Sequence, residues 1–179
     1  MNLANKLTMI RVALIPFFLL VLYVVEPPYN IYVGVAIFVI ASVTDFVDGY
    51  IARSRNLITD FGKFMDPLAD KLLVSAALIY MTEVGMIPAW ITIIIISREF
   101  VVSGIRLVAA TNGTVLAASI WGKIKTAVTM VMIVYVMLDL PIPYYQVLGW
   151  ILIAAATFFT LLSGYDYVAK NWKMFEGKM

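Results

Sequence analysis

Four aspartates at the edges of two strongly apolar stretches have a spacing that suits metal binding. Asp45 and Asp48 are three residues apart, and Asp66 and Asp70 are four apart. On helices, the two members of each pair would share one face. Carboxylates beside a hydrocarbon-buried segment are costly and usually mark function. Two such faces brought together would form an all-oxygen site of the kind that binds Mg²⁺, Mn²⁺ or Ca²⁺.

The residues between the two aspartate pairs suit a phosphorylated ligand. Gly49 and Gly62 offer bare backbone, and Ala52 carries a small side chain. Arg53 supplies a planar guanidinium that can bind a pyrophosphate through two parallel hydrogen bonds. Close helix packing would also explain Gly49 and Ala52. Beside two carboxylates, we favour close approach of a nucleotide phosphate to the backbone.

The composition excludes most soluble enzymes and several kinds of site. The chain has 179 residues, of which 63% are hydrophobic and 13% are charged, whereas globular chains carry about 25% charged residues. Cysteine and histidine are both absent, which excludes disulfides, thiolate metal sites and histidine-dependent catalytic triads. Proton transfer near neutral pH therefore falls to a carboxylate, a lysine, a tyrosine or water.

Six apolar stretches approach the length of about 20 residues that a helix needs to cross a bilayer. They are residues 7–25, 31–50, 64–81, 87–110, 120–138 and 147–168. We therefore predict an all-α, polytopic membrane protein with six transmembrane helices in one domain, residues 1–179. A short amphipathic N-terminal segment, residues 2–8, is expected to lie in the membrane interface.

The distribution of basic residues predicts how the helices are oriented. The loops 26–28, 83–88 and 139–143 contain no Lys or Arg, and all thirteen basic residues fall toward the other side. By the positive-inside rule, both termini and the aspartates should face the cytoplasm from the inner or plasma membrane. Glu26-Pro27-Pro28 follows the first stretch where a signal peptide would have small residues. Tyr165 and Tyr167, near the end of the last stretch, are typical of an interfacial aromatic belt.

Pro67 constrains the third stretch. The residue before a proline is pushed away from the helical region, so the helix should either start near Asp66 or kink there. Both outcomes would leave Asp66 and Asp70 near the membrane surface, level with the first aspartate pair.

A second polar cluster indicates a pocket for a small anionic substrate. Its five cations are Lys63, Arg98, Arg106, Lys123 and Lys125. Lys123 and Lys125 can also be interpreted as the positive flank of a helix, and Arg98 as one half of a buried pair with Glu99. A flank explains the lysines easily, but it does not explain an arginine well inside an apolar run.

The whole stretch from Asp45 to Asp70 reads D-x-x-D-G-x-x-A-R-x8-G-x-x-x-D-x-x-x-D. Without any departure, it resembles the signature of the CDP-alcohol phosphotransferases. This resemblance implies transfer of a phosphatidyl group from CDP-diacylglycerol to an alcohol, with release of CMP. It also implies two divalent cations, Mg²⁺ or Mn²⁺, with Asp45 and Asp66 on both, Asp48 on the first and Asp70 on the second. Asp70 would also be the base that takes the proton of the attacking hydroxyl.

The same resemblance implies a binding site for CDP-diacylglycerol. An N-x-x-T-x-x-R element before the first apolar stretch recurs in the family and borders the CDP group, and a residue near Thr59 contacts the cytidine. The residues implied for this site are Asn5, Thr8, Arg11, Gly49, Ala52, Arg53, Thr59 and Gly62.

The acceptor alcohol is indicated by two further segments. Residues 97–106, S-R-E-F-x-V-S-G-x-R, and 122–126, G-K-x-K-T, are similar to the family members that use glycerol 3-phosphate. The five cations would then bind its phosphate. Inositol phosphate, inositol, serine and phosphatidylglycerol remain alternatives, although serine and inositol have less use for so many cations. The family also suggests a homodimer.

A divalent-cation transporter is the alternative from another class. Transporters tend to place their ion sites at mid-membrane on broken helices, often within inverted repeats. Here the acids cluster near one face, and no convincing repeat is present. A transport site would not need the glycines, Arg53 and a separate basic pocket, so the sequence favours the enzyme.

Overall fold

The computed structural model describes residues 3–54, 60–111, 116 and 119–172, and within them the chain forms six α-helices and no strand. The helices are α1 (Leu3–Val24), α2 (Tyr29–Ser54), α3 (Asp60–Glu83), α4 (Ala89–Thr111), α5 (Ile120–Leu138) and α6 (Tyr145–Asn171). The predicted all-α class and the helix count are confirmed for this part of the chain.

Two local predictions need correction. Residues 3–8 form the start of α1 and are not a segment of their own. The third helix begins at Asp60 and continues through Pro67, which excludes a start near Asp66; the alternative, a kink at that position, stays a prediction. Proline removes one backbone donor and restricts its predecessor, yet α3 is one helix across Pro67.

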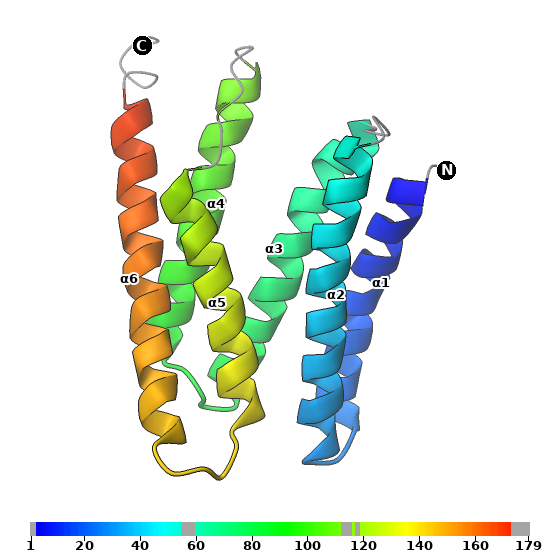
Figure 1. Ribbon diagram of the computed structural model, residues 1–179, viewed down its shortest axis with the longest axis vertical. Helices are drawn as coiled ribbons and strands as arrows, with labels where there is room; N and C mark the ends of the chain where they lie inside the picture. Colours follow the sequence, from blue (N-terminus) through cyan, green and yellow to red (C-terminus); the bar gives the residue numbers. More distant parts are fainter. Residues whose placement is uncertain (1–2, 55–59, 112–115, 117–118, 173–179) are drawn as a thin grey trace. The chain divides into compact units, whose positions relative to one another are not determined.

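The helices form two compact units, Met1–Tyr80 and Met81–Met179, and α3 runs across the boundary between them. The single domain stays a prediction. In the first unit, α1 and α2 form an antiparallel hairpin (Figure 1). Asn30 ties its two arms together, because its buried side chain donates to the carbonyl oxygen of Leu22 at 3.1 Å. Phe18 and Phe38 pack between the helices, with ring centroids 6.3 Å apart.

In the second unit, α5 and α6 form a hairpin, and α4 packs against α6 (Figure 1). Asp139 and Tyr144, on either side of two prolines, turn the chain with left-handed backbone angles. At the other end of α5, the side chain of Ser119 accepts a hydrogen bond from the Gly122 amide at 3.1 Å, which caps the helix. The end of α4, the start of α5 and the end of α6 lie at the same end of this unit (Figure 1).

The distribution of side chains on α6 is that of a helix in a membrane. Its buried stripe consists largely of small or hydroxyl-bearing residues, including Gly149, Ala156 and Thr160, whereas Phe158 and Leu161 are exposed. Membrane helices pack through small residues and direct their large apolar side chains to lipid. α5 and α6 are each long and apolar enough to cross a membrane. The chain is therefore a membrane protein.

Candidate active site

The four aspartates of the motif lie on two helices of the first unit. Asp45 and Asp48 belong to the second half of α2, and Asp66 and Asp70 to the first half of α3. Each pair lies within one continuous helix, which is the condition under which residues three or four apart share a face. Their side chains are not among those that the structure describes, so the metal site stays a prediction. Among the described side chains, no group of three or more acidic residues could hold a metal ion.

The residues implied for the CDP-diacylglycerol site also belong to the first unit. Gly49, Ala52 and Arg53 continue α2 beyond the aspartates, and Gly62 lies in the first turn of α3, next to Lys63 of the predicted acceptor pocket. Asn5, Thr8 and Arg11 lie in the first half of α1. The structure describes only the backbone at these positions, and Thr59 falls outside the described residues.

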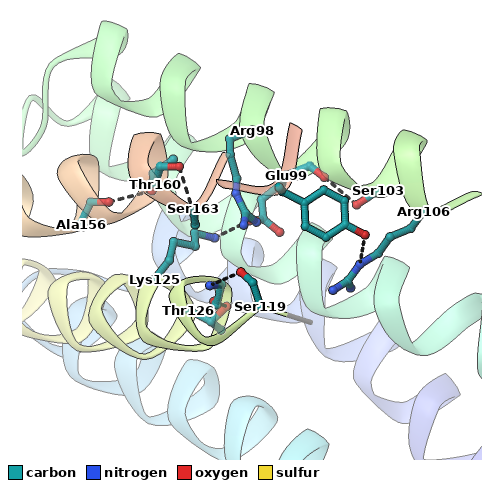
Figure 2. Close-up of polar contacts among 12 residues, drawn as sticks. Arg98, Glu99, Ser103, Arg106, Ser119, Lys125, Thr126, Ala156, Thr160 and Ser163 are labelled. Atoms are coloured by element: carbon teal, nitrogen blue, oxygen red, sulfur yellow. Dashed lines mark hydrogen bonds and ion pairs between the residues drawn. The ribbon is translucent and has the colours of Figure 1, made fainter. Parts of the chain in front are cut away.

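Helices α4 and α5 of the second unit bring two of the predicted cations together around one carboxylate (Figure 2). Nη1 of Arg98 donates to Oε1 of Glu99 at 3.1 Å, and Nζ of Lys125 donates to the same oxygen. The side chain of Lys125 is only 4% exposed and that of Arg98 is 13% exposed. The predicted pair of Arg98 with Glu99 is present, while Lys125 is buried and is therefore not a solvated flank.

Gly164 allows the stem of Arg98 to pass close to α6, and Gly122 of α5 lies near its guanidinium. A Cβ atom on Gly164 of α6 would lie 3.3 Å from Cγ of Arg98, closer than most Cβ contacts, so the arginine stem fits against α6 because no side chain is there. A Cβ atom on Gly122 would lie 3.6 Å from Nη2 of Arg98. The guanidinium therefore lies beside the first turn of α5, the end of the helix that carries partial positive charge.

Arg106, two turns further along α4, contacts α6 instead. Its Nε donates to the hydroxyl of Tyr167 at 3.1 Å, and its guanidinium carbon lies 5.5 Å from the centre of the same ring. Tyr167 is 3% exposed and packs with Val102 and Ile105, so the interfacial-belt interpretation does not hold for it. Lys123 is exposed at the start of α5.

Arg98, Glu99 and Lys125 together form a group that we call the second-unit cluster, and its described side chains carry more positive than negative charge. Among the side chains that the structure describes here, Arg98 and Lys125 contribute two cations against the one carboxylate of Glu99, all at low exposure. Nε of Arg98 is buried without a hydrogen-bond partner among the described residues. A buried donor of this kind is costly unless something accepts from it. Chemically, the cluster is suited to bind an anion.

Sequence reasoning left two residues without a functional assignment. The sequence suggests Glu99 only as a partner for Arg98, although the carboxylate also binds Lys125 from another helix. An acid inside an apolar run beside an arginine was the available signal. For Tyr167 there was none, because Tyr165 two residues earlier looks equivalent in the sequence.

Comparison with known proteins identifies the family. Residues 1–162 match the family model described as CDP-alcohol phosphatidyltransferase. A protein of Bacillus subtilis named CDP-diacylglycerol–glycerol-3-phosphate 3-phosphatidyltransferase is 46% identical, with 96% of each chain covered. Proteins of the same name from Rickettsia bellii and Pseudomonas fluorescens are 38% and 36% identical, covering 97% and 96% of this chain and 97% and 91% of their own. The aspartate motif on α2 and α3 and this match over nearly the whole chain lead to one conclusion: the chain belongs to the CDP-alcohol phosphatidyltransferase family.

Proposed function

We propose that the protein transfers the phosphatidyl group of CDP-diacylglycerol to glycerol 3-phosphate, giving phosphatidylglycerol phosphate and CMP. The observation that carries the proposal is the 46% identity to the Bacillus subtilis protein of that name, over 96% of both chains. The anion-binding character of the second-unit cluster supports a phosphorylated acceptor over serine or inositol.

Two divalent cations, Mg²⁺ or Mn²⁺, fit the donor set of the aspartate motif. Asp45, Asp48, Asp66 and Asp70 supply only hard carboxylate oxygens, which these cations prefer. In this proposal Asp45 and Asp66 would serve both cations, Asp48 the first and Asp70 the second. When bound, the cations neutralise charge on the pyrophosphate and on the departing CMP.

The transfer needs one proton acceptor and no covalent enzyme intermediate. Asp70 takes the proton of the attacking hydroxyl, whose oxygen forms a bond to the phosphorus that carries the diacylglycerol. The bond between that phosphorus and the bridging oxygen of the pyrophosphate breaks, and CMP leaves with the electron pair. Backbone at Gly49 and Gly62 and the guanidinium of Arg53 hold the CDP group, together with Asn5, Thr8, Arg11, Ala52 and Thr59.

The acceptor phosphate binds to the five predicted cations, four of which belong to the second unit. Arg98 and Lys125 are already gathered around Glu99, and the unpartnered Nε–H of Arg98 offers a donor to a phosphate oxygen. The Nε–H of Arg106 donates to the hydroxyl of Tyr167. Its two terminal amino groups can therefore donate to two oxygens of the acceptor phosphate. Lys63 and Lys123 complete the proposed set.

The membrane topology completes the proposal. All six helices cross the bilayer, both termini and the active site face the cytoplasm, and the protein resides in the plasma or inner membrane. This orientation is supported by the positive-inside rule applied to the loops. The diacylglycerol tails stay in the bilayer while the head group reacts at its surface, and the protein acts as a homodimer.

The test is a head-group competition assay with purified protein and labelled CDP-diacylglycerol. We expect CMP release and a labelled lipid phosphate only when glycerol 3-phosphate is added, and not with serine, inositol or phosphatidylglycerol. Inositol phosphate is the sharpest competitor, because it carries the same anionic group. Efficient use of inositol phosphate and none of glycerol 3-phosphate would refute the acceptor assignment.

Chelation tests the metal in the same assay. Activity should disappear with excess chelator and return with Mg²⁺ or Mn²⁺, since four carboxylates without cations would repel the pyrophosphate. Asp45→Asn should lose orders of magnitude in rate while remaining folded. Asp139→Asn, the same change at the turn between α5 and α6, is the matched control and should stay active. Full activity after exhaustive chelation would rule out the metal site.

A further inference from the structure

Tyr167 is buried, and it also contacts Arg106, one of the proposed acceptor cations. Its ring is 3% exposed and is held between Val102 and Ile105 of α4. Its hydroxyl accepts from Nε of Arg106 at 3.1 Å, and the guanidinium carbon lies 5.5 Å from the ring centre. One contact is made by Nε and the other by the guanidinium carbon. Together they restrict both the position and the tilt of the guanidinium group.

Because Nε is the donor to Tyr167, the terminal nitrogens of Arg106 are left for another acceptor. A guanidinium carries five N–H groups in a fixed plane, and Tyr167 accepts only the one on Nε. Among the described residues, no other group accepts from Arg106. The outer edge, with the two terminal nitrogens, is the edge that binds two phosphate oxygens at once.

We infer that Tyr167 is a positioning residue for the acceptor: it holds Arg106 so that the outer edge of the guanidinium meets the acceptor phosphate. The inference rests on the proposed function, in which Arg106 binds that phosphate. Tyr167 itself touches neither substrate. A fixed arginine loses less side-chain freedom when the phosphate binds than a mobile one does, so the tyrosine should improve acceptor affinity.

Tyr167→Phe tests this by removing the hydroxyl alone. The ring stays in its packed place, and the contact of the guanidinium with the aromatic face is retained. We expect the KM for glycerol 3-phosphate to rise about three- to tenfold, the effect of losing one ordinary hydrogen bond, because the contact of Arg106 with the phosphate is itself retained. The KM for CDP-diacylglycerol and the melting temperature should stay near those of the parent.

Tyr165→Phe is the matched control, because Tyr165 lies on the same helix two residues away and is 76% exposed. It removes an identical hydroxyl and should leave the acceptor KM unchanged. A second check combines Tyr167→Phe with Arg106→Ala. If the tyrosine acts through the arginine, adding Tyr167→Phe to the Arg106→Ala protein should change the acceptor KM no further.

The possible outcomes distinguish a failure of this inference from a failure of the proposed function. A parent protein that does not use glycerol 3-phosphate or another phosphorylated acceptor would overturn the proposed function. An active parent whose Tyr167→Phe and Tyr165→Phe variants have the same acceptor KM would overturn only the role of Tyr167. Equal losses for donor and acceptor, with a lowered melting temperature, would show that the hydroxyl serves packing and would likewise refute the positioning role.

Discussion

Replacing Glu99 by alanine should destabilise the protein, because it leaves two cations close together at low exposure. Lys125 and Arg98 both donate to Oε1 of this carboxylate, and the lysine side chain is 4% exposed. Removing one partner of a buried ion pair costs 3–5 kcal/mol, since a charge is left buried without compensation. Glu99 is itself 19% exposed, so water screens part of the interaction and we expect about 3 kcal/mol, the lower end of that range.

The assay is unfolding of the purified protein in mixed micelles, followed by loss of helical signal as the denaturing detergent is increased. Lys123→Ala is the control, because Lys123 lies two residues from Lys125 and is exposed; its effect should stay within about 0.5 kcal/mol. The double variant Glu99→Leu, Lys125→Met should recover part of the loss, since apolar replacements of a buried pair are often tolerated.

Two results would refute this reasoning. One is a Glu99→Ala protein that is no less stable than Lys123→Ala, which would mean that water or another group compensates the cations. The other is a double variant that is no more stable than Glu99→Ala. In that case, the loss would come from packing around position 99 and not from the uncompensated charge on Lys125.

Three further predictions concern catalysis, acceptor binding and helix packing. Asp70→Asn should lower kcat far more than it weakens CDP-diacylglycerol binding, measured by equilibrium titration, because a proton acceptor matters most in the transition state; tenfold weaker donor binding with normal turnover would contradict this. Arg106→Ala should raise the acceptor KM about ten- to a hundredfold, and parental kinetics in a correctly inserted protein would disprove the contact. Gly164→Ala should cost about 1 kcal/mol by crowding the stem of Arg98. Gly149→Ala, where a Cβ has ordinary clearance, should not lower the melting temperature.

The sequence by itself is enough to predict the helices and the family. Residues 120–138 were predicted as a helix, and α5 has those bounds. This succeeds because helix formation in a membrane depends on local properties, chiefly a long apolar run that must satisfy its own backbone hydrogen bonds. The aspartate motif could likewise be identified from residue types and spacing alone. The start of α3 was missed by four residues, because the turns before Pro67 are too polar to belong to an apolar stretch.

Only the tertiary structure decided which of two similar residues faces the interior. Lys123 and Lys125 look alike as helix flanks, yet Lys125 is buried against Glu99 and Lys123 is exposed. Tyr165 and Tyr167 look alike as belt residues, yet only Tyr167 packs inside and binds Arg106. Residues two apart on a helix point about 200° away from each other. The rotation of each helix about its own axis therefore selects one of each pair, and that rotation is set by packing against neighbouring helices that are distant in the sequence.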